Sequence, residues 1–244
     1  MIIEVALLAA KHSSSMGLAK AAVGIAALIF SIVTHIRAAK ARKQIRKWAL
    51  QKGFRYARKD TGKTLYGRLV HFVGVLRRGT SRAIYDIIEI PTPVGTTQTL
   101  LFNFLYYTQS GRQRVPNWLA CGLITLNAHF PETVIRREFG IERILDLIGF
   151  PDINFEWAEF SRAFRVKSAK RKFAFLLINH KMMEFLMEKK DLRIGVYLSG
   201  PYIFFWSDGF HKVENLQTYM GFMRDFWDRV PELARQEAMG RKRR

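Results

Sequence analysis

The chain has 244 residues, of which 40 are Lys or Arg and 20 are Asp or Glu, so its formal net charge is +20 at pH 7. Hydrophobic residues make up 49% of the chain and aromatic residues 13%, which excludes a disordered basic tail protein, because such chains are poor in core-forming residues. The single cysteine, Cys121, excludes an intramolecular disulfide framework. Together with the absence of an Asn-x-Ser/Thr sequon, it favours a domain in a reducing compartment.

The excess positive charge is concentrated near the N-terminus. Residues 37–82 contain 15 Lys or Arg and one acidic residue, Asp60, and the last four residues add four more positive charges. Residues 83–240 contain 19 basic and 18 acidic residues and are almost neutral. The charge therefore indicates a local basic region and not a uniformly basic protein.

An apolar run directly precedes this basic region. Residues 21–36 read AAVGIAALIFSIVTHI, and counted from Met16 the run forms a helix of about 31 Å, long enough to cross a bilayer core. A cleaved signal peptide is disfavoured, because basic residues follow where a small-residue cleavage site would stand. A buried core helix is disfavoured because a helix that is apolar on every side would need a larger protein around it than this one. We predict a single transmembrane helix at 16–36.

The flanks of this span predict its orientation. Basic residues crowd its C-terminal side, whereas residues 1–15 carry only Lys11 and the compensating Glu4. The positive-inside rule places residues 1–15 outside as an extracytoplasmic segment and everything after Arg37 in the cytoplasm. The chain is thus predicted to be a single-pass protein of the cell membrane, and its oligomeric state stays open.

The cytosolic part is predicted to begin with a helix and continue as a mixed domain. Residues 37–52 lack Pro and Gly and predict a basic juxtamembrane helix that ends at Gly53. Residues 53–235 are predicted to form the domain, and 236–244 a basic tail. Segments rich in β-branched and aromatic residues predict strands. These are 82–90 and 99–107, joined as a hairpin by the loop 91–98, then 119–126, 133–137 and 160–168, and a second hairpin of 192–198 and 202–206 around Ser199-Gly200-Pro201.

Helices are predicted where apolar residues recur at steps of three and four. They are a short helix at 139–148, an amphipathic helix at 172–188, and a C-terminal helix at 213–230 that Pro231 ends. Strands and helices alternate without a βαβ rhythm. The expected class is α+β, with a largely antiparallel sheet packed with amphipathic helices.

Three groups of residues are candidates for catalytic or metal-binding sites. Asp60-Thr-Gly-Lys-Thr64 lacks the first glycine of a phosphate-binding loop and the second triplet of an aspartic protease, so a turn is favoured. His180, Glu184 and Glu188 share a helix face, but lysines crowd it and a solvated surface is favoured. Asp152, Glu156 and Glu159 lie near Arg162 and Arg165 in sequence, which favours ion pairs.

Neither a catalytic residue nor a metal or cofactor site is therefore predicted. Cys121 lies in the apolar run 119–126 and is expected to be a buried small hydrophobe. The chain is predicted not to be an enzyme.

The basic region has two readings. Lys and Arg beside a membrane span contact anionic lipid headgroups, with Trp48 as an interfacial aromatic residue. The same cations, interleaved with aromatic residues, are typical of nucleic-acid binding. The lipid reading is favoured because it requires no additional partner. The predicted contact residues under either reading are Arg37, Lys40, Arg42, Lys43, Arg46, Lys47, Arg55, Arg58 and Lys59.

Four segments carry a family resemblance. They are 152–156 (DINFE), 159–168 (EFSRAFRVKS), 172–174 (KFA) and 182–186 (MMEFL). They resemble the C-terminal part of membrane-anchored bacterial proteins of unknown function, which pair an N-terminal membrane helix with a cytosolic α+β domain. The resemblance implies a fold and an anchor and no activity. This chain is basic at 169–172 and 179–181, where that family tends to have acidic residues and a proline.

The leading hypothesis is a single-pass membrane protein whose cytosolic domain binds a protein or anionic-lipid partner at the inner membrane surface. A membrane-tethered nucleic-acid-binding protein that uses residues 37–82 is the alternative. An enzyme of unrecognised type is the third possibility.

Overall fold

The computed structural model describes residues 40–111, 113–137 and 149–240. The predicted span at 16–36, the predicted helix at 139–148 and Arg37 lie outside the described residues. One compact unit comprises Ile45–Arg244. Residues 40–51 are helical, and the first five of them belong to the other unit, Met1–Gln44.

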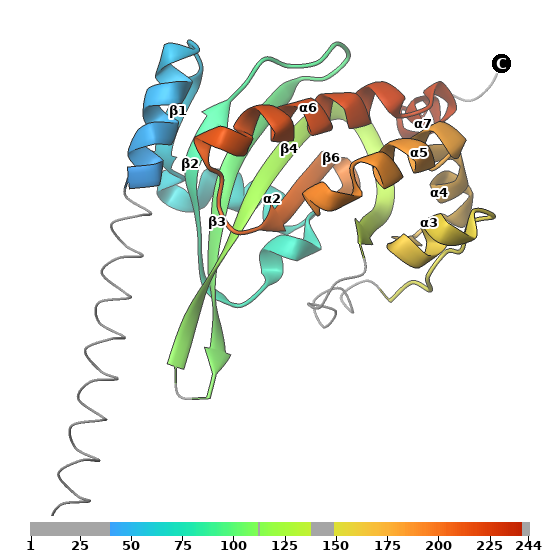
Figure 1. Ribbon diagram of the computed structural model, residues 1–244, viewed down its shortest axis with the longest axis horizontal. Coiled ribbons are helices and arrows are strands. Elements are labelled where there is room, and N and C mark those ends of the chain that lie inside the picture. The colour runs from blue at the N-terminus through green and yellow to red at the C-terminus, as the bar shows by residue number, and fades with distance from the viewer. Residues whose placement is uncertain (1–39, 112, 138–148, 241–244) are drawn as a thin grey trace, which may run out of the picture. The chain divides into compact units, whose positions relative to one another are not determined.

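An antiparallel six-stranded sheet organises the larger unit (Figure 1). Its strands are β1 (Arg55–Lys59), β2 (Thr80–Glu89), β3 (Gln98–Ser110), β4 (Gln113–Arg137), β5 (Phe164–Ser168) and β6 (Gly195–Asp208). The order is β1-β2-β3-β4-β5, and β6 also pairs with β4. Every one of these pairings is antiparallel. The predicted fold class, an α+β domain with a largely antiparallel sheet, is confirmed at this level.

Strand β4 is the central strand of the sheet and pairs with three others. Its first half pairs with β3 and its last five residues pair with β5, while β6 pairs with it from Leu119 to Ile135. The sequence predicts two separate strands here, at 119–126 and 133–137. The structure joins them into one strand of 25 residues, and the intervening residues absorb register shifts on both sides of Phe130.

The predicted second hairpin is wrong, because β6 runs straight through Ser199-Gly200-Pro201. Gly200 has a positive φ of 54° and pairs with Phe130 at the irregular part of β4. The glycine therefore accommodates a bulge and not a chain reversal. A Cβ at this position would lie 2.5 Å from the ring of Phe72, so the close approach also requires glycine.

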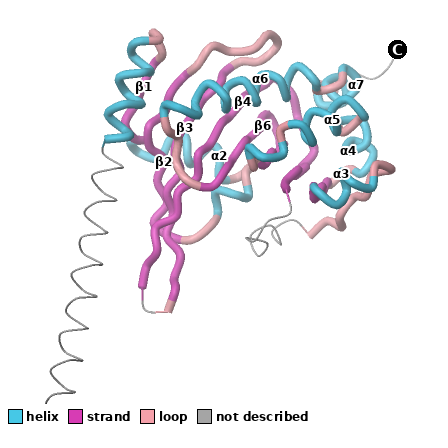
Figure 2. The backbone as a smooth tube through the Cα atoms, in the orientation of Figure 1, coloured by secondary structure: helices cyan, strands magenta, loops and turns pink. Residues whose placement is uncertain are grey.

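The helices lie on both faces of the sheet (Figure 2). They are α2 (Thr64–Val70), α3 (Ala158–Ala163), α4 (Arg171–Leu177), α5 (His180–Glu188), α6 (Val213–Arg229) and α7 (Glu232–Ala238), with 3₁₀ turns at Thr61–Lys63, Gly74–Arg77 and Lys190–Leu192. One apolar cluster contains buried residues of α4, α5, α6, α7 and the helix at 45–51. The other contains residues of α2 and the turn Gly74–Arg77. Successive residues of a strand enter opposite clusters, as Phe204 and Phe205 do, because strand side chains alternate between faces.

Two predicted elements between β4 and β6 differ from the structure. The predicted strand at 160–168 is a strand only from Phe164, and α3 precedes it. The predicted helix at 172–188 is divided into α4 and α5. Asn179 starts the second helix, because its Oδ1 accepts a hydrogen bond from the Met182 N–H at 3.0 Å. The C-terminal helix is confirmed as α6, and α7 follows Pro231.

Replacing Asn179 with alanine is expected to lower the free energy of unfolding by about 1 kcal/mol, the usual effect of losing an N-cap side chain. Urea unfolding followed by tryptophan fluorescence measures the difference. Asn179→Asp, which keeps an acceptor oxygen, should retain most of the stability. Equal stability of the alanine and wild-type chains would show that the cap contributes nothing.

Candidate anion-binding surface

The basic residues that the sequence indicates lie on two consecutive elements. Residues 40–51 form a helix, and β1 follows it after Gly53. Exposed residues among the predicted contacts are Lys40, Lys43, Arg46, Lys47, Arg55, Arg58 and Lys59. Arg42 is half-buried. All the predicted contact residues that the structure describes, apart from Arg42, therefore face solvent.

The helix at 45–51 is amphipathic. Ile45 and Ala49, spaced four apart, are buried in the core, which leaves Arg46 and Lys47 on the outer face. Trp48 is half-buried, and its ring packs edge to face on Phe54 with centroids 5.5 Å apart. This tryptophan therefore contributes to packing, whatever else it contacts.

Strand β1 is the edge of the sheet and carries Arg55, Arg58 and Lys59. It pairs with β2 alone in the described sheet. Arg55 lies 3.6 Å from a Glu89 carboxylate oxygen, and Lys59 lies over the Tyr85 ring at 5.6 Å. Charged side chains on an edge strand also discourage the association of two sheets edge to edge. These residues therefore have a structural role even without a ligand.

Three further basic residues lie near β1, one each on the turn Thr61–Lys63, α2 and β2. Two hollows of about 390 and 340 Å³ flank the turn that joins β1 to α2 and share Lys59, Asp60 and Thr61. Lys63 and Arg82 line the first of them, and Arg55 and Arg68 line the second. We call Arg55, Arg58, Lys59, Lys63, Arg68 and Arg82 the basic edge.

Asp60, the only acidic residue between positions 37 and 82, is used to build the turn. Its carboxylate accepts hydrogen bonds from the Thr64 hydroxyl at 3.0 Å and from the backbone N–H groups of Leu65 and Tyr66 at 3.1 and 2.8 Å. The carboxylate thus satisfies amides of the first turn of α2. Asp60-Thr-Gly-Lys-Thr64 is a turn, and it holds Lys63 and Arg68 beside β1.

A buried polar chain fixes β1 to the rest of the sheet. The Tyr56 hydroxyl donates to Asp86 at 2.7 Å, and the Asn103 amide donates to the other Asp86 oxygen at 3.1 Å. Asn103 in turn accepts from the His211 backbone N–H at 2.7 Å. Because Asp86 and Asn103 are both about 98% buried, these bonds connect three strands to the start of α6 and keep the edge strand in register.

The other candidate groups behave as structural residues. His180 lies 3.1 Å from Glu184, and Glu188 lies beside Lys189. No group of three metal-ligating side chains occurs in the described ranges. Asp152 pairs with Arg165 at 3.0 Å, as expected of an ion pair. Cys121 is fully buried, and burial raises the pKa of its thiol, which stays neutral.

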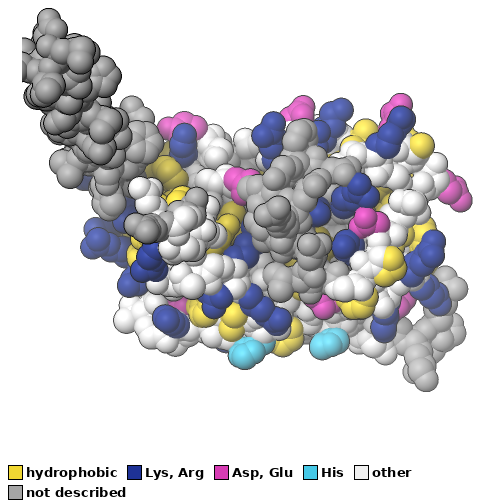
Figure 3. All heavy atoms as spheres, turned by 90° about the horizontal axis from the view of Figure 1, so that it is seen from below, with side chains coloured by type: hydrophobic (Ala, Val, Ile, Leu, Met, Phe, Trp, Pro, Cys, Tyr) yellow, Lys and Arg dark blue, Asp and Glu magenta, His cyan; other side chains and the backbone are white. Residues whose placement is uncertain are grey.

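The basic edge suits an anionic ligand with several charges. Arginine forks and lysine ammonium groups bind phosphate oxygens, and exposed cations act together on a ligand that spans several of them. Figure 3 shows one face of the molecule, on which Lys and Arg side chains are more numerous than Asp and Glu.

Comparisons with known proteins find a likeness of fold. No protein-family model matches the chain, and no curated protein matches it. Within the described residues, no helix has the length and apolar character needed to span a membrane. A solved structure is similar, the crystal structure of the mycobacterial trehalose monomycolate transport factor A, TtfA, with a TM-score of 0.53 over 78% of this chain and 96% of that chain. At 11% sequence identity, what the two chains share is the fold.

Proposed function

We propose that the chain is a single-pass membrane protein, anchored by residues 16–36, whose domain binds a partner at the inner membrane surface and catalyses no reaction of its own. The partner is an anionic lipid headgroup or a protein that presents acidic groups. The observation that carries the proposal is the run of exposed cations along the helical residues 45–51, β1, the turn Thr61–Lys63 and α2, which follows the predicted span in the sequence.

The attraction between the exposed cations and anionic lipid headgroups is strong enough to bind the domain to a membrane surface. A Lys or Arg near an anionic membrane surface contributes about 1 kcal/mol, and the attraction decays over about 8 Å at physiological ionic strength. A domain tethered to the membrane by the proposed anchor encounters the headgroups repeatedly, and its cations act whenever they come within that range.

The topology is tested with the full chain. A fluorescent protein fused after Arg244 that folds only in the cytoplasm should fluoresce, and alkaline phosphatase fused at the same place should be inactive. The reverse result would place the domain outside and overturn the proposal.

Lipid binding is tested in nanodiscs that contain the full chain. In discs with anionic phosphatidylglycerol, the amides of β1 and α2 should exchange hydrogen more slowly than in discs of phosphatidylcholine alone. The substitution R58Q/K63Q/R68Q should abolish this difference. Three cations at about 1 kcal/mol each correspond to a factor of about 100 in the local binding equilibrium.

The three substituted side chains make no hydrogen bond or ion pair with other described residues, so their replacement leaves the fold intact. The matched control is K172Q/K181Q/K190Q, which removes three exposed lysines from α4, α5 and the turn after α5. Protection that survives the first substitution, or that the control also abolishes, would contradict a role for the basic edge. If RNA or DNA protects β1 and α2 at physiological salt and anionic lipid does not, the nucleic-acid alternative holds instead.

A further inference from the structure

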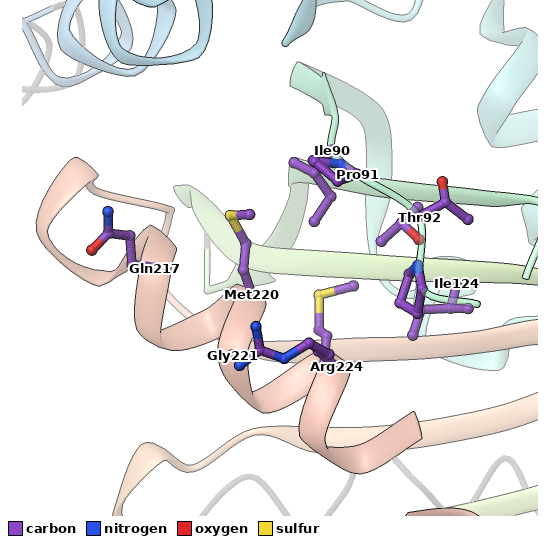
Figure 4. Close-up of a pocket in the computed structure, with 11 residues that line it drawn as sticks. Ile90, Pro91, Thr92, Ile124, Gln217, Met220, Gly221 and Arg224 are labelled. Carbon is purple, nitrogen blue, oxygen red and sulfur yellow. The ribbon is translucent and has the colours of Figure 1, made fainter. Parts of the chain in front are cut away.

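A hollow of about 460 Å³ lies between α6 and the β2–β3 loop (Figure 4). It is on the opposite face of the sheet from the hollows of the basic edge, because its residues Ile90, Ile124 and Met223 belong to the other apolar cluster. Six of its eleven lining side chains are apolar. They are Ile90, Pro91, Pro93, Ile124, Met220 and Met223. We call this hollow the α6 groove.

The wall formed by the β2–β3 loop is held in place without a ligand. The Trp227 indole N–H donates to the Val94 carbonyl at 3.0 Å. The backbone N–H of Thr97 donates to the Thr125 carbonyl at 2.8 Å, and the Thr97 hydroxyl donates to the same oxygen at 3.0 Å. Pro91 and Pro93 restrict the backbone of the loop directly before Val94. The α6 groove is therefore preformed, which lowers the free energy needed to bind a ligand.

The helical wall carries a notch at Gly221. A Cβ built on Gly221 would meet no atom within 4 Å, so the space above the helix is open there. Glycine is among the poorest residues inside a helix, and α6 is otherwise a regular amphipathic helix of 17 residues. Met220, which is half-buried, lies next to the notch and has an unbranched, adaptable side chain.

One charge marks the rim of the α6 groove. Arg224 is the only charged residue among its lining residues. Its side chain is 66% exposed, and its guanidinium lies 3.4 Å from the carboxylate of the neighbouring Asp225. A guanidinium that is mostly exposed beside an apolar surface can pair with an anionic group of a ligand whose apolar part lies in the groove.

The volume of the α6 groove indicates the size of ligand that it can hold. A volume of 460 Å³ is within the usual range for small-molecule sites, about 300–1,000 Å³. We propose that the α6 groove binds a long-chain carboxylate, with its hydrocarbon chain between Met220 and the loop residues Pro91 and Pro93, which are the apolar lining residues with accessible surface, and its carboxylate on Arg224. This inference is independent of the basic edge and of the proposed membrane partner.

The test uses the full chain in nanodiscs and a palmitic acid analogue with a photoreactive diazirine in its chain. After irradiation, mass spectrometry should find the label on peptides of α6 and residues 90–99, and unlabelled palmitate should compete. Gly221→Phe fills the notch and should reduce this labelling by about tenfold or more, as expected for the loss of 1.4 kcal/mol or more of binding. Arg224→Gln should weaken labelling by the acid and leave labelling by the corresponding fatty alcohol unchanged.

Two variants separate groove filling from misfolding. Gly67 in α2 is also a helical glycine with no atom within 4 Å of a built Cβ, so Gly67→Phe should leave the labelling unchanged. Gly221→Ala is too small to fill the notch and should raise the Tm by about 2–4 °C through its higher helix propensity, while the labelling persists. Undiminished labelling of Gly221→Phe, or labelling that maps elsewhere, would overturn the proposal.

Discussion

Replacing Phe205 with alanine is expected to lower the free energy of unfolding by about 3–5 kcal/mol, the usual range for a fully buried phenylalanine. Phe205 is on β6 with no solvent exposure. Its ring packs edge to face on Phe226 and Phe222 of α6, with centroids 5.5 and 6.1 Å apart. Alanine would leave a cavity where α6, the longest of the described helices, meets the sheet, and neighbouring aromatic rings relax only partly into such a space.

The measurement is equilibrium urea unfolding followed by tryptophan fluorescence. The matched control is Phe175→Ala in α4, because Phe175 is 44% exposed and leaves no closed cavity. We expect the control to lose much less stability, mainly its contacts with Phe155 and Arg171. Equal losses for the two variants would mean that the interface of β6 and α6 does not stabilise the domain as its packing indicates.

Elements with a strong local pattern are the ones that the sequence predicts correctly. The stripe that includes Leu216, Met223 and Trp227 is buried along α6, as its spacing indicates. The hairpin of β2 and β3 also follows from local signals, because a loop rich in Pro, Gly and Thr separates two strand-like runs. In both cases one element and its nearest neighbour in sequence suffice to decide the structure.

The errors occur where a distant residue decides the outcome. Gly200 continues a strand and does not form a turn, because it opposes the irregular part of β4 and lies against Phe72. Phe160 and Phe164 fit a period of two and also a helical step of four. Their rings stack with centroids 5.1 Å apart across the end of α3. The apolar alternation from which a strand is predicted is therefore, in its first half, the spacing of a helical turn.

The candidate surfaces were only partly predictable for the same reason. Charge counting finds Arg55, Arg58 and Lys59, because they lie in one basic stretch. The position of Lys63 and Arg68 near that strand depends on how the Asp60 turn directs α2, and no sequence pattern specifies it. For the α6 groove, the sequence contains one local indication, the glycine Gly221 inside an otherwise regular amphipathic helix. That glycine indicates a groove only when the β2–β3 loop is known to lie opposite it.

Acid is expected to destabilise the domain through His211. This histidine is 1% exposed at the start of α6, and burial lowers its pKa from 6.5 to about 4, although its hydrogen bond to the Cys121 carbonyl raises the pKa in part. The Nε2 atom lies 2.9 Å from that carbonyl oxygen. A carbonyl can only accept, so Nε2 carries the proton of the neutral ring. Nδ1 has no hydrogen-bond partner among the described residues.

Protonation therefore places an unpaired charge in the core. The nearest titratable groups cannot compensate for it, because burial raises the pKa of Cys121 and of Tyr219, whose ring packs on His211 at 4.7 Å, and keeps both neutral. Since the folded-state pKa lies below the unfolded value, the unfolded chain binds more protons between pH 6.5 and pH 4. Stability is fully present above pH 6.5 and is lost as the pH falls through this window, by about 3 kcal/mol in total.

Unfolding free energies measured between pH 7.5 and pH 4 test this expectation. His211→Gln keeps an N–H donor near the Cys121 carbonyl and removes the titrating ring, so its stability should depend less on pH in this window than that of the wild type. His129→Gln replaces an exposed histidine of β4 and should retain the wild-type slope. The difference between the two variants isolates the buried ring from the carboxylates that also titrate in acid. If His211→Gln loses stability with falling pH as steeply as the wild type, burial of this histidine is not what makes the fold acid-sensitive.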